Sequence, residues 1–275
     1  MNAVFDLNRW LLYVGKHWNE NRKKYLLSLG AIVGLLVLWF SFLILTSGER
    51  PIEVNLQAVT YYVGLFLCGS LLASLMFADL SDGPKAIHFL LVPASALEKL
   101  LSALLYGVVL FFISYTLVYY LVDFIMVKVA YNAAVTAHHT EFLTPAAAQV
   151  VNVFVTPHEQ GDNFYIYFLL AYIGIQSAFF LGSVYFVKFS YIKTAVSVLV
   201  AFVSLAFFIH KVMGSFVPDG NFYEPFSTYR IYKPSGDVAV QLPDWLSNIL
   251  LFLFKYIMAP VFYVATYFRL KEKEV

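Results

Sequence analysis

The chain has 275 residues, of which 61% are apolar, 19% aromatic and only 13% charged, and its mean hydropathy is +0.74. Soluble globular domains carry roughly 25% charged residues, so this composition excludes an ordinary soluble domain. The formal net charge of +1 gives no indication of a nucleic-acid partner.

The first twenty-four residues predict an amphipathic helix lying at the cytoplasmic membrane surface. Apolar residues recur there at three- and four-residue spacings among polar ones, which favours a helix with one apolar face. Trp10 is of a type enriched at membrane interfaces. No basic stretch leads into a short apolar core with a cleavage site, so these residues do not resemble a signal peptide.

Six apolar segments are predicted to cross the membrane. They cover residues 25–45, 59–77, 100–122, 164–187, 194–212 and 245–268. Each is close to the ~20 residues that span a hydrocarbon core. Backbone polar groups must be paired within hydrocarbon, so these segments are expected to be helices. The predicted fold is therefore an all-α integral membrane protein with one transmembrane domain over residues 1–275.

The distribution of Lys and Arg predicts the orientation. One side of the membrane collects twelve of the 18 basic residues, namely Arg9, Lys16, Arg22, Lys23, Lys24, Lys85, Lys99, Lys188, Lys193, Arg269, Lys271 and Lys273. The other side collects Arg50, Lys128, Lys211, Arg230 and Lys233. The positive-inside rule places the first side, and with it both termini, in the cytoplasm.

The two long loops on the outer side, residues 123–163 and 213–244, are partly apolar. Thr144 followed by Pro145 is a typical start of a helix, which predicts a short helix over Pro145–Val155. The second loop is rich in tyrosine, proline and glycine and is expected to be irregular.

The cytoplasmic loop between the second and third spans, residues 78–100, has the clearest local signals. Gly83 and Pro84 can start a short helix over Pro84–Leu91, whose apolar residues are available to the membrane surface. Pro93 ends it, because the residue before a proline avoids the helical conformation.

Ser95 and Glu98 then form a capping-box pattern, in which each side chain bonds the other residue's backbone N–H. The third span is thus expected to begin as a rigid helix at Ala96. On local physics alone, the favoured interpretation is that this loop is only a well-capped return into the membrane.

The segment LLVPASALEKLL, Leu90–Leu101, resembles the LP-x-S-x-x-E-x signature after the second span of ABC-2 type (type V) ABC transporter permeases. The amphipathic N-terminal helix, six spans and short helix also match that family. There the short helix docks on a separate ATP-binding subunit, and the permease pairs with a second copy of itself. The resemblance implies a docking surface formed by Pro84, Lys85, Ile87, His88, Pro93, Ser95 and Glu98. Two departures are that Ala94 and Ala96 stand where the family often carries Arg, and that loop 123–163 replaces a brief turn.

Signatures of catalysis are absent from the sequence. Gly15 and Lys16 are followed by His17, without the glycine of a P-loop, and neither H-E-x-x-H nor G-x-S-x-G occurs. The prediction is that this chain is not an enzyme and holds no cofactor. The resemblance places ATP and Mg in a partner subunit. No metal site is predicted, because the candidate ligands His138, His139, Glu141 and His158 show no recognisable ligand spacing.

Lys255 lies ten residues into the sixth predicted span, ~15 Å deep at the rise of an α-helix. A charged residue at that depth is costly and marks a candidate functional site. Asp123, or carbonyl groups freed by Pro260, are candidate partners, and Lys255 with Asp123 is a candidate translocation path. The alternative is a lysine that snorkels or lines a wet groove.

Small residues predict close helix packing. They are Gly30, Gly34, Gly174, Ala178 and Gly182. Both packing within the chain and a homodimer contact are compatible with this pattern.

Many aromatic residues are expected to form interfacial belts. Examples are Tyr61, Tyr62, Tyr119, Tyr120 and Trp245. An apolar path for a lipid-like substrate is the alternative.

The leading hypothesis from the sequence is the membrane-spanning permease subunit of an ABC-type exporter in a bacterial cytoplasmic (inner) membrane. Its expected partners are an ATP-binding subunit, a second copy and membrane lipid. The sequence does not identify the substrate, but the weakly charged spans are compatible with a hydrophobic or amphipathic molecule. The alternative is a non-transporting scaffold or anchor subunit of an envelope assembly.

Overall fold

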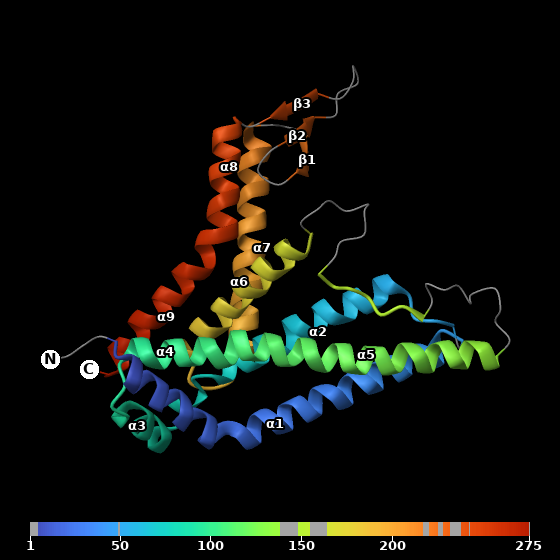
Figure 1. Ribbon diagram of the computed structural model, residues 1–275. Helices are drawn as coiled ribbons and strands as arrows, with labels where there is room; N and C mark the ends of the chain where they lie inside the picture. Colours follow the sequence, from blue (N-terminus) through green and yellow to red (C-terminus); the bar gives the residue numbers. More distant parts are fainter. Residues whose placement is uncertain are drawn as a thin grey trace.

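The computed structural model describes residues 5–48, 50–137, 148–154, 164–216, 220–224, 228–231, 238–241 and 243–274 (Figure 1). Six helices are long and apolar enough to cross a membrane, which fits an integral membrane protein. Their bounds are Leu7–Thr46, Val54–Leu75, Ala96–Thr136, Tyr165–Tyr185, Ser190–Phe208 and Asp244–Glu274. The prediction of six apolar helices is thus confirmed.

The first helix, α1 (Leu7–Thr46), runs without a break from the N-terminal stretch into the first predicted span. The two parts are expected from the sequence as separate elements, but no proline separates them, and basic residues at 22–24 are good helix formers. Asp6 caps the helix, because its carboxylate accepts hydrogen bonds from the backbone N–H groups of Asn8 and Arg9.

The remaining elements follow in chain order. The first half continues with α2 (Val54–Leu75), the short η1 (Ala78–Ser81), α3 (Gly83–Leu91), α4 (Ala96–Leu104), the π-helical η2 (Leu105–Leu110) and α5 (Phe111–Thr136). The second half comprises α6 (Phe164–Tyr185), α7 (Ser190–Phe216), β1 (Gly220–Glu224), β2 (Thr228–Ile231), β3 (Val238–Gln241), α8 (Asp244–Phe252), the π-helical η5 (Leu253–Ile257) and α9 (Met258–Glu274).

Helix packing brings both ends of the chain together. α1 packs against α5, α2 against α6, and α6 against both α7 and α9. The start of α1, the start of α4 and the end of α9 therefore meet at one end of the molecule, beside α3 (Figure 1). This end is called the α3 end below.

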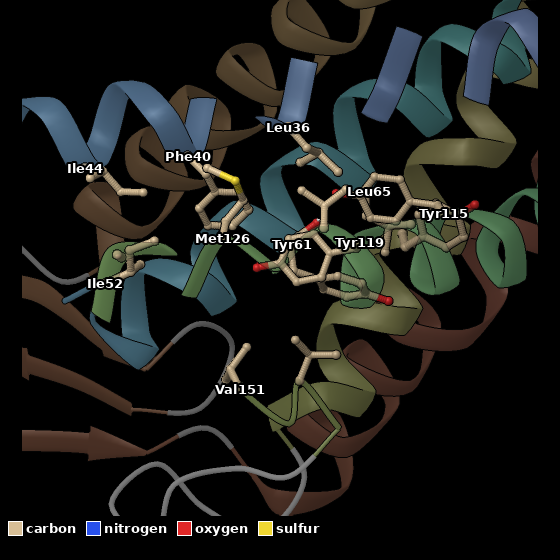
Figure 2. Packing of buried hydrophobic residues seen from close by; sticks show 14 of the residues in the cluster. Leu36, Phe40, Ile44, Ile52, Tyr61, Leu65, Tyr115, Tyr119, Met126 and Val151 are labelled. Atoms are coloured by element: carbon tan, nitrogen blue, oxygen red, sulfur yellow. Dashed lines mark hydrogen bonds between the residues drawn. The ribbon is translucent and has the colours of Figure 1, made fainter. Parts of the chain in front are cut away.

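The largest core cluster lies away from the α3 end and joins α1, α2, α5 and residues 148–154 (Figure 2). Its members include Leu36, Phe40, Ile44, Tyr61, Leu65, Tyr115, Tyr119, Met126 and Val151. The Tyr119 hydroxyl donates to the backbone carbonyl of Gln57 at 2.6 Å, and the Tyr61 hydroxyl bonds that of Thr116 at 2.8 Å. The belt prediction is therefore wrong for Tyr61 and Tyr119, which are buried with their hydroxyls satisfied.

Segment 148–154 corrects the prediction of a helix over Pro145–Val155, because its described residues form no α-helix. Gln57 binds this segment instead. Its side-chain oxygen accepts from the Val151 N–H at 2.9 Å, and its amide donates to the Gln149 carbonyl at 3.3 Å. Side chains from the bundle thus take the backbone bonds that a helix would use. Residues 145–147 and 155 lie outside the described part of the chain.

The loop after α7, expected to be irregular, contains an antiparallel sheet in the order β1-β2-β3. β2 pairs with β3 in register from Thr228 opposite Gln241 to Ile231 opposite Val238. The β-branched and aromatic residues of these strands favour extended pairing. The all-α prediction therefore holds for the membrane helices but not for this sheet.

Candidate functional site

The candidate site is the α3 end, and its outermost element is α3. A proline in the first turn of α3 fixes the backbone for helix formation. The helix stops at Val92, which adopts an extended conformation before Pro93. Ile87 and Leu91 are 61% and 77% exposed, so α3 presents an apolar surface without a partner inside the described part of the chain.

Charged groups flank this surface. Lys85 is exposed and pairs with Asp82 one turn earlier at 2.9 Å. The hydrogen bond to Asp82 raises the pKa of Lys85 above its ordinary value, so Lys85 is a cation at neutral pH. His88 is also exposed. α3 is therefore an amphipathic helix with a basic edge.

The predicted capping box is present at the start of α4. The Ser95 hydroxyl accepts from the Glu98 N–H at 3.2 Å, and the Glu98 carboxylate accepts from the Ser95 N–H at 2.9 Å. This capping box fixes the first turn of α4 at the end of the connection between α3 and α4.

The Glu98 carboxylate also binds the N-terminal end of the chain. Arg9 donates its Nη2 to Oε1 at 2.7 Å and its Nε to Oε2 at 2.8 Å, a two-pronged ion pair. The Asp6 N–H adds a third bond at 2.8 Å. Glu98 is 0% exposed, and its bonds to Arg9 and Asp6 fasten α1 to α4, while its bond to Ser95 caps α4.

Lys99 binds the C-terminal end in the same way. Its ammonium group lies 2.7 Å from the Glu274 carboxylate, at the end of α9. It also donates to the Leu90 carbonyl at 3.4 Å and lies 5.1 Å from the centre of the Phe89 ring. Since Phe89 and Leu90 belong to α3, Lys99 joins α3, α4 and α9 at one buried point.

An aromatic cluster holds residues 14–25 of α1 against η2. The ring of Tyr106 stacks on those of Tyr25 and Trp18, with centroids 5.6 and 6.4 Å away. The Tyr106 hydroxyl donates to the Val14 carbonyl at 3.0 Å, and His17 shares a hydrogen bond with the Tyr25 hydroxyl at 2.7 Å. α1 is thus attached to the α4–α5 helix at two levels.

A groove of about 380 Å³ separates the start of α1 from the α3–α4 connection. It is lined by Arg9, Leu12, Tyr13, Lys16, His88, Leu91, Val92, Pro93 and Ala94. The groove extends the exposed surface of α3 toward α1.

The residues predicted for docking therefore fall into two groups. Pro84, Lys85, Ile87, His88 and Pro93 are exposed. Ser95 and Glu98 instead use their side chains within the chain.

Sequence reasoning missed Arg9, Lys99 and Glu274. The available signal was the adjacent pair of opposite charges at 98 and 99 inside an apolar stretch, since buried charges require partners.

The predicted pair of Lys255 and Asp123 is not formed. The Lys255 ammonium lies 4.4 Å from the centre of the Tyr167 ring of α6. Asp123 is 0% exposed, and neither of its carboxylate oxygens has a hydrogen-bond partner among the described residues. The structure therefore does not join these residues into a path.

The small residues predicted for helix packing also fall into two groups, one at the open surface and one packed within the chain. A Cβ atom added at Gly30, Gly34 or Gly174 would meet no other atom within 4 Å, so these glycines face open surface. One added at Gly182 would collide with Thr194 of α7. Ala178 and Gly182 line a groove of about 320 Å³ shared with α7 and Phe262 of α9. Gly182 thus serves packing within the chain.

The histidines at 138, 139 and 158, with Glu141, lie outside the described residues. Within the described ranges, no three His, Cys, Asp or Glu side chains are grouped to hold a metal ion. No protein-family model, curated protein or solved structure matches the chain. The resemblance of Leu90–Leu101 to ABC-2 permeases thus rests on that segment and on the order of the helices.

Proposed function

We propose that this chain is the membrane-spanning permease subunit of an ABC-type exporter, powered by a separate ATP-binding subunit. The substrate is a hydrophobic or amphipathic molecule, and the location is a bacterial cytoplasmic membrane. ATP and Mg belong to the partner, and the chain itself carries no catalytic residue.

The observation that carries this proposal is the connection of α3 to the membrane helices. α3 exposes Ile87 and Leu91, as a docking helix must, and Lys99 binds both its last turn and the end of α9. Glu98, the residue before Lys99, binds the start of α1. A force on α3 therefore acts on three helices through charged hydrogen bonds.

This connection explains how a partner would drive transport. Binding or hydrolysis of ATP changes which packing of the helices is favoured only if the partner contacts the two packings differently. Movement of α3 displaces the Leu90 carbonyl and the Phe89 ring from Lys99. Helices α4 and α9 then shift together, as packed helices do in shear motions.

The orientation follows from the basic residues. The α3 end carries Arg9, Lys16, Lys85, Lys99, Lys271 and Lys273, so the positive-inside rule places it in the cytoplasm. The first turns of α1 expose Leu7, Leu11 and Leu12. We infer that this part lies at the membrane surface.

A second copy of the chain is part of the proposal. Gly30 and Gly34, one turn apart on α1, face open surface, and such pairs allow close approach of helices in membranes. A dimer through α1 would leave α3 of each copy free for its own ATP-binding subunit.

Purification in mild detergent followed by mass spectrometry tests the proposal. A stoichiometric P-loop ATPase should accompany the native chain, and the double variant Ile87→Ser/Leu91→Ser should lose it. Val187→Ser/Phe189→Ser, which changes two exposed apolar residues between α6 and α7, is the matched control and should retain it. Absence of an ATPase from the native preparation would contradict the proposal.

The second candidate is a scaffold or anchor subunit of an envelope assembly. The ordered sheet β1–β3 between α7 and α8 favours it, because such a sheet offers a defined surface to an outer partner. In the same purification, envelope proteins in place of an ATPase would support this candidate.

A further inference from the structure

A buried amide that makes no hydrogen bond to the described residues lies in the middle of the helix bundle. Gln176 of α6 is 1% exposed, and neither its side-chain oxygen nor its nitrogen has a hydrogen-bond partner among the described residues. It stands twelve residues after the first residue of α6, ~18 Å along the axis. Unmade hydrogen bonds at buried groups are rare in native proteins, so this amide is a candidate binding group.

Space for the amide is created by Gly69 of α2. A Cβ atom at Gly69 would collide with the Gln176 nitrogen and would lie 2.9 Å from the Tyr172 ring and 3.2 Å from the Phe111 ring. Any larger residue at position 69 would therefore fill the place of the amide. Gly69 is the position at which α2 makes room for a polar group of α6.

Two tyrosine hydroxyls extend this polar spot. The Tyr263 hydroxyl of α9 is buried and has no hydrogen-bond partner in the part of the chain that the structure describes. The Tyr172 hydroxyl reaches the Val108 carbonyl of η2 only at 3.5 Å. The Gln176 side chain lies beside the Tyr172 hydroxyl and the Tyr263 hydroxyl is a further neighbour, but neither polar atom of Gln176 meets hydrogen-bond geometry with the described residues. Polar groups of α6 and α9 can therefore still donate and accept hydrogen bonds at this place. They lie near η2, and π-helical turns are often found at functional sites.

The hydrogen-bonding character and the charge of these groups indicate what kind of ligand they would bind. A carboxamide and two phenols both donate and accept hydrogen bonds but carry no charge. Among the described residues, the groups that interact with the Tyr172 hydroxyl include Tyr263, Gln176 and Tyr61, all of which are uncharged. The matching ligand is an uncharged O–H group, which also donates and accepts.

We propose that Gln176, Tyr172 and Tyr263 form an intramembrane binding site for an uncharged hydroxyl group. The hydroxyl belongs either to the neutral headgroup of an amphiphile or to a bound water molecule. The site is built from α2, α6 and α9 alone and does not depend on an ATP-binding partner.

Thermal unfolding of the purified full chain in phosphatidylcholine nanodiscs tests the site. The probe is dioctanoylglycerol, whose headgroup is one hydroxyl, and its control is trioctanoylglycerol, in which an ester replaces that hydroxyl. At saturation the probe should raise the unfolding midpoint of the native chain by about 3 °C or more. It should not raise that of Gln176→Leu or Gln176→Met.

Folding of the variants is checked by a matched glutamine. Gln57 is also fully buried, but its amide and carbonyl are hydrogen-bonded to backbone groups. Without probe, Gln57→Leu should lower the midpoint by several degrees and Gln176→Leu should lower it less, because the Gln176 amide meets no hydrogen-bond geometry with the described residues.

A separate measurement tests whether the bound hydroxyl group belongs to a water molecule. An infrared O–H stretching band that shifts in ¹⁸O-labelled water and is absent from Gln176→Leu identifies bound water. That band without an effect of dioctanoylglycerol supports the site with water as its ligand. Absence of both signals, or an equal shift with trioctanoylglycerol, would overturn the proposal.

Discussion

Glu98 and Lys99, consecutive residues of opposite charge, bind the two opposite ends of the chain. The Glu98 carboxylate pairs with Arg9 in the first turn of α1, and the Lys99 ammonium pairs with Glu274 in the last turn of α9. Successive residues of a helix point in different directions, so one turn of α4 can hold two helices. This arrangement makes the start of α4 the point at which α3, α1 and α9 meet.

Removing Arg9 should destabilise the chain more than neutralising Glu98. Arg9→Met leaves the fully buried Glu98 carboxylate without its cation, and an uncompensated buried charge is strongly unfavourable. Glu98→Gln keeps a polar group that can still bond the backbone N–H of Asp6 and Ser95. We expect Arg9→Met to lower the unfolding midpoint by several degrees more.

The double variant Arg9→Met/Glu98→Met completes this comparison. Its loss should be smaller than the sum of the two single Met variants, because the pair is coupled. Additive losses in a double-mutant cycle would mean that the two side chains act independently.

Lys99→Met should loosen α3 as well as the end of α9, whose Glu274 loses its ion pair. The variant removes the hydrogen bond to the Leu90 carbonyl and the contact with the Phe89 ring. Loss of a hydrogen bond from a charged donor corresponds to about tenfold faster local opening. Amide hydrogen exchange over Gly83–Leu91 measures this effect.

Lys273→Met is the matched control for that measurement. Lys273 donates to the Val184 carbonyl of α6 at 2.7 Å, so its removal should leave exchange in α3 unchanged. Equal acceleration in both variants would show that Lys99 has no specific connection to α3.

Gly34→Leu should affect dimer formation, whereas Gly182→Leu should affect the stability of the single chain. Gly34 faces open surface, so leucine there should preserve the stability of the single chain but disrupt a dimer through α1. Gly182 abuts Thr194, so leucine there should lower the unfolding midpoint. Light scattering with size-exclusion chromatography and thermal unfolding measure the two effects. A dimer that survives Gly34→Leu would exclude this face as the contact.

Asp123→Asn should keep or raise the stability of the chain. An isolated ionised carboxylate is expensive to bury, and Asp123 has no hydrogen-bond partner among the described residues. Asparagine has nearly the same shape without the charge. A drop of several degrees in the unfolding midpoint of Asp123→Asn would instead reveal a bound cation at this carboxylate.

The sequence predicts those features that local patterns determine. Hydropathy locates the six apolar helices, and the Ser95–Glu98 spacing predicts the capping box, because both depend on neighbouring residues. The pairing of Arg9 with Glu98 joins residues 89 positions apart. Nothing local specifies it, and it arises only when α1 and α4 pack together.

The tyrosines give a second example of a feature that local sequence does not determine. An interfacial belt is the ordinary role of a tyrosine near the end of a membrane helix. Tyr119 instead turns inward, where its hydroxyl reaches the Gln57 carbonyl of α2. Which face of a helix is inside depends on its neighbours. A sequence with apolar residues on every face does not reveal it.

The most direct test of the docking claim is photo-crosslinking in the native membrane. A photoreactive amino acid is placed at Ile87 of α3, and at Val187 as an exposed control outside the α3 surface. Mass spectrometry then identifies the crosslinked protein. We expect peptides of a P-loop ATPase at Ile87 and none at Val187. Crosslinks from Ile87 only to lipid or to envelope proteins would contradict it.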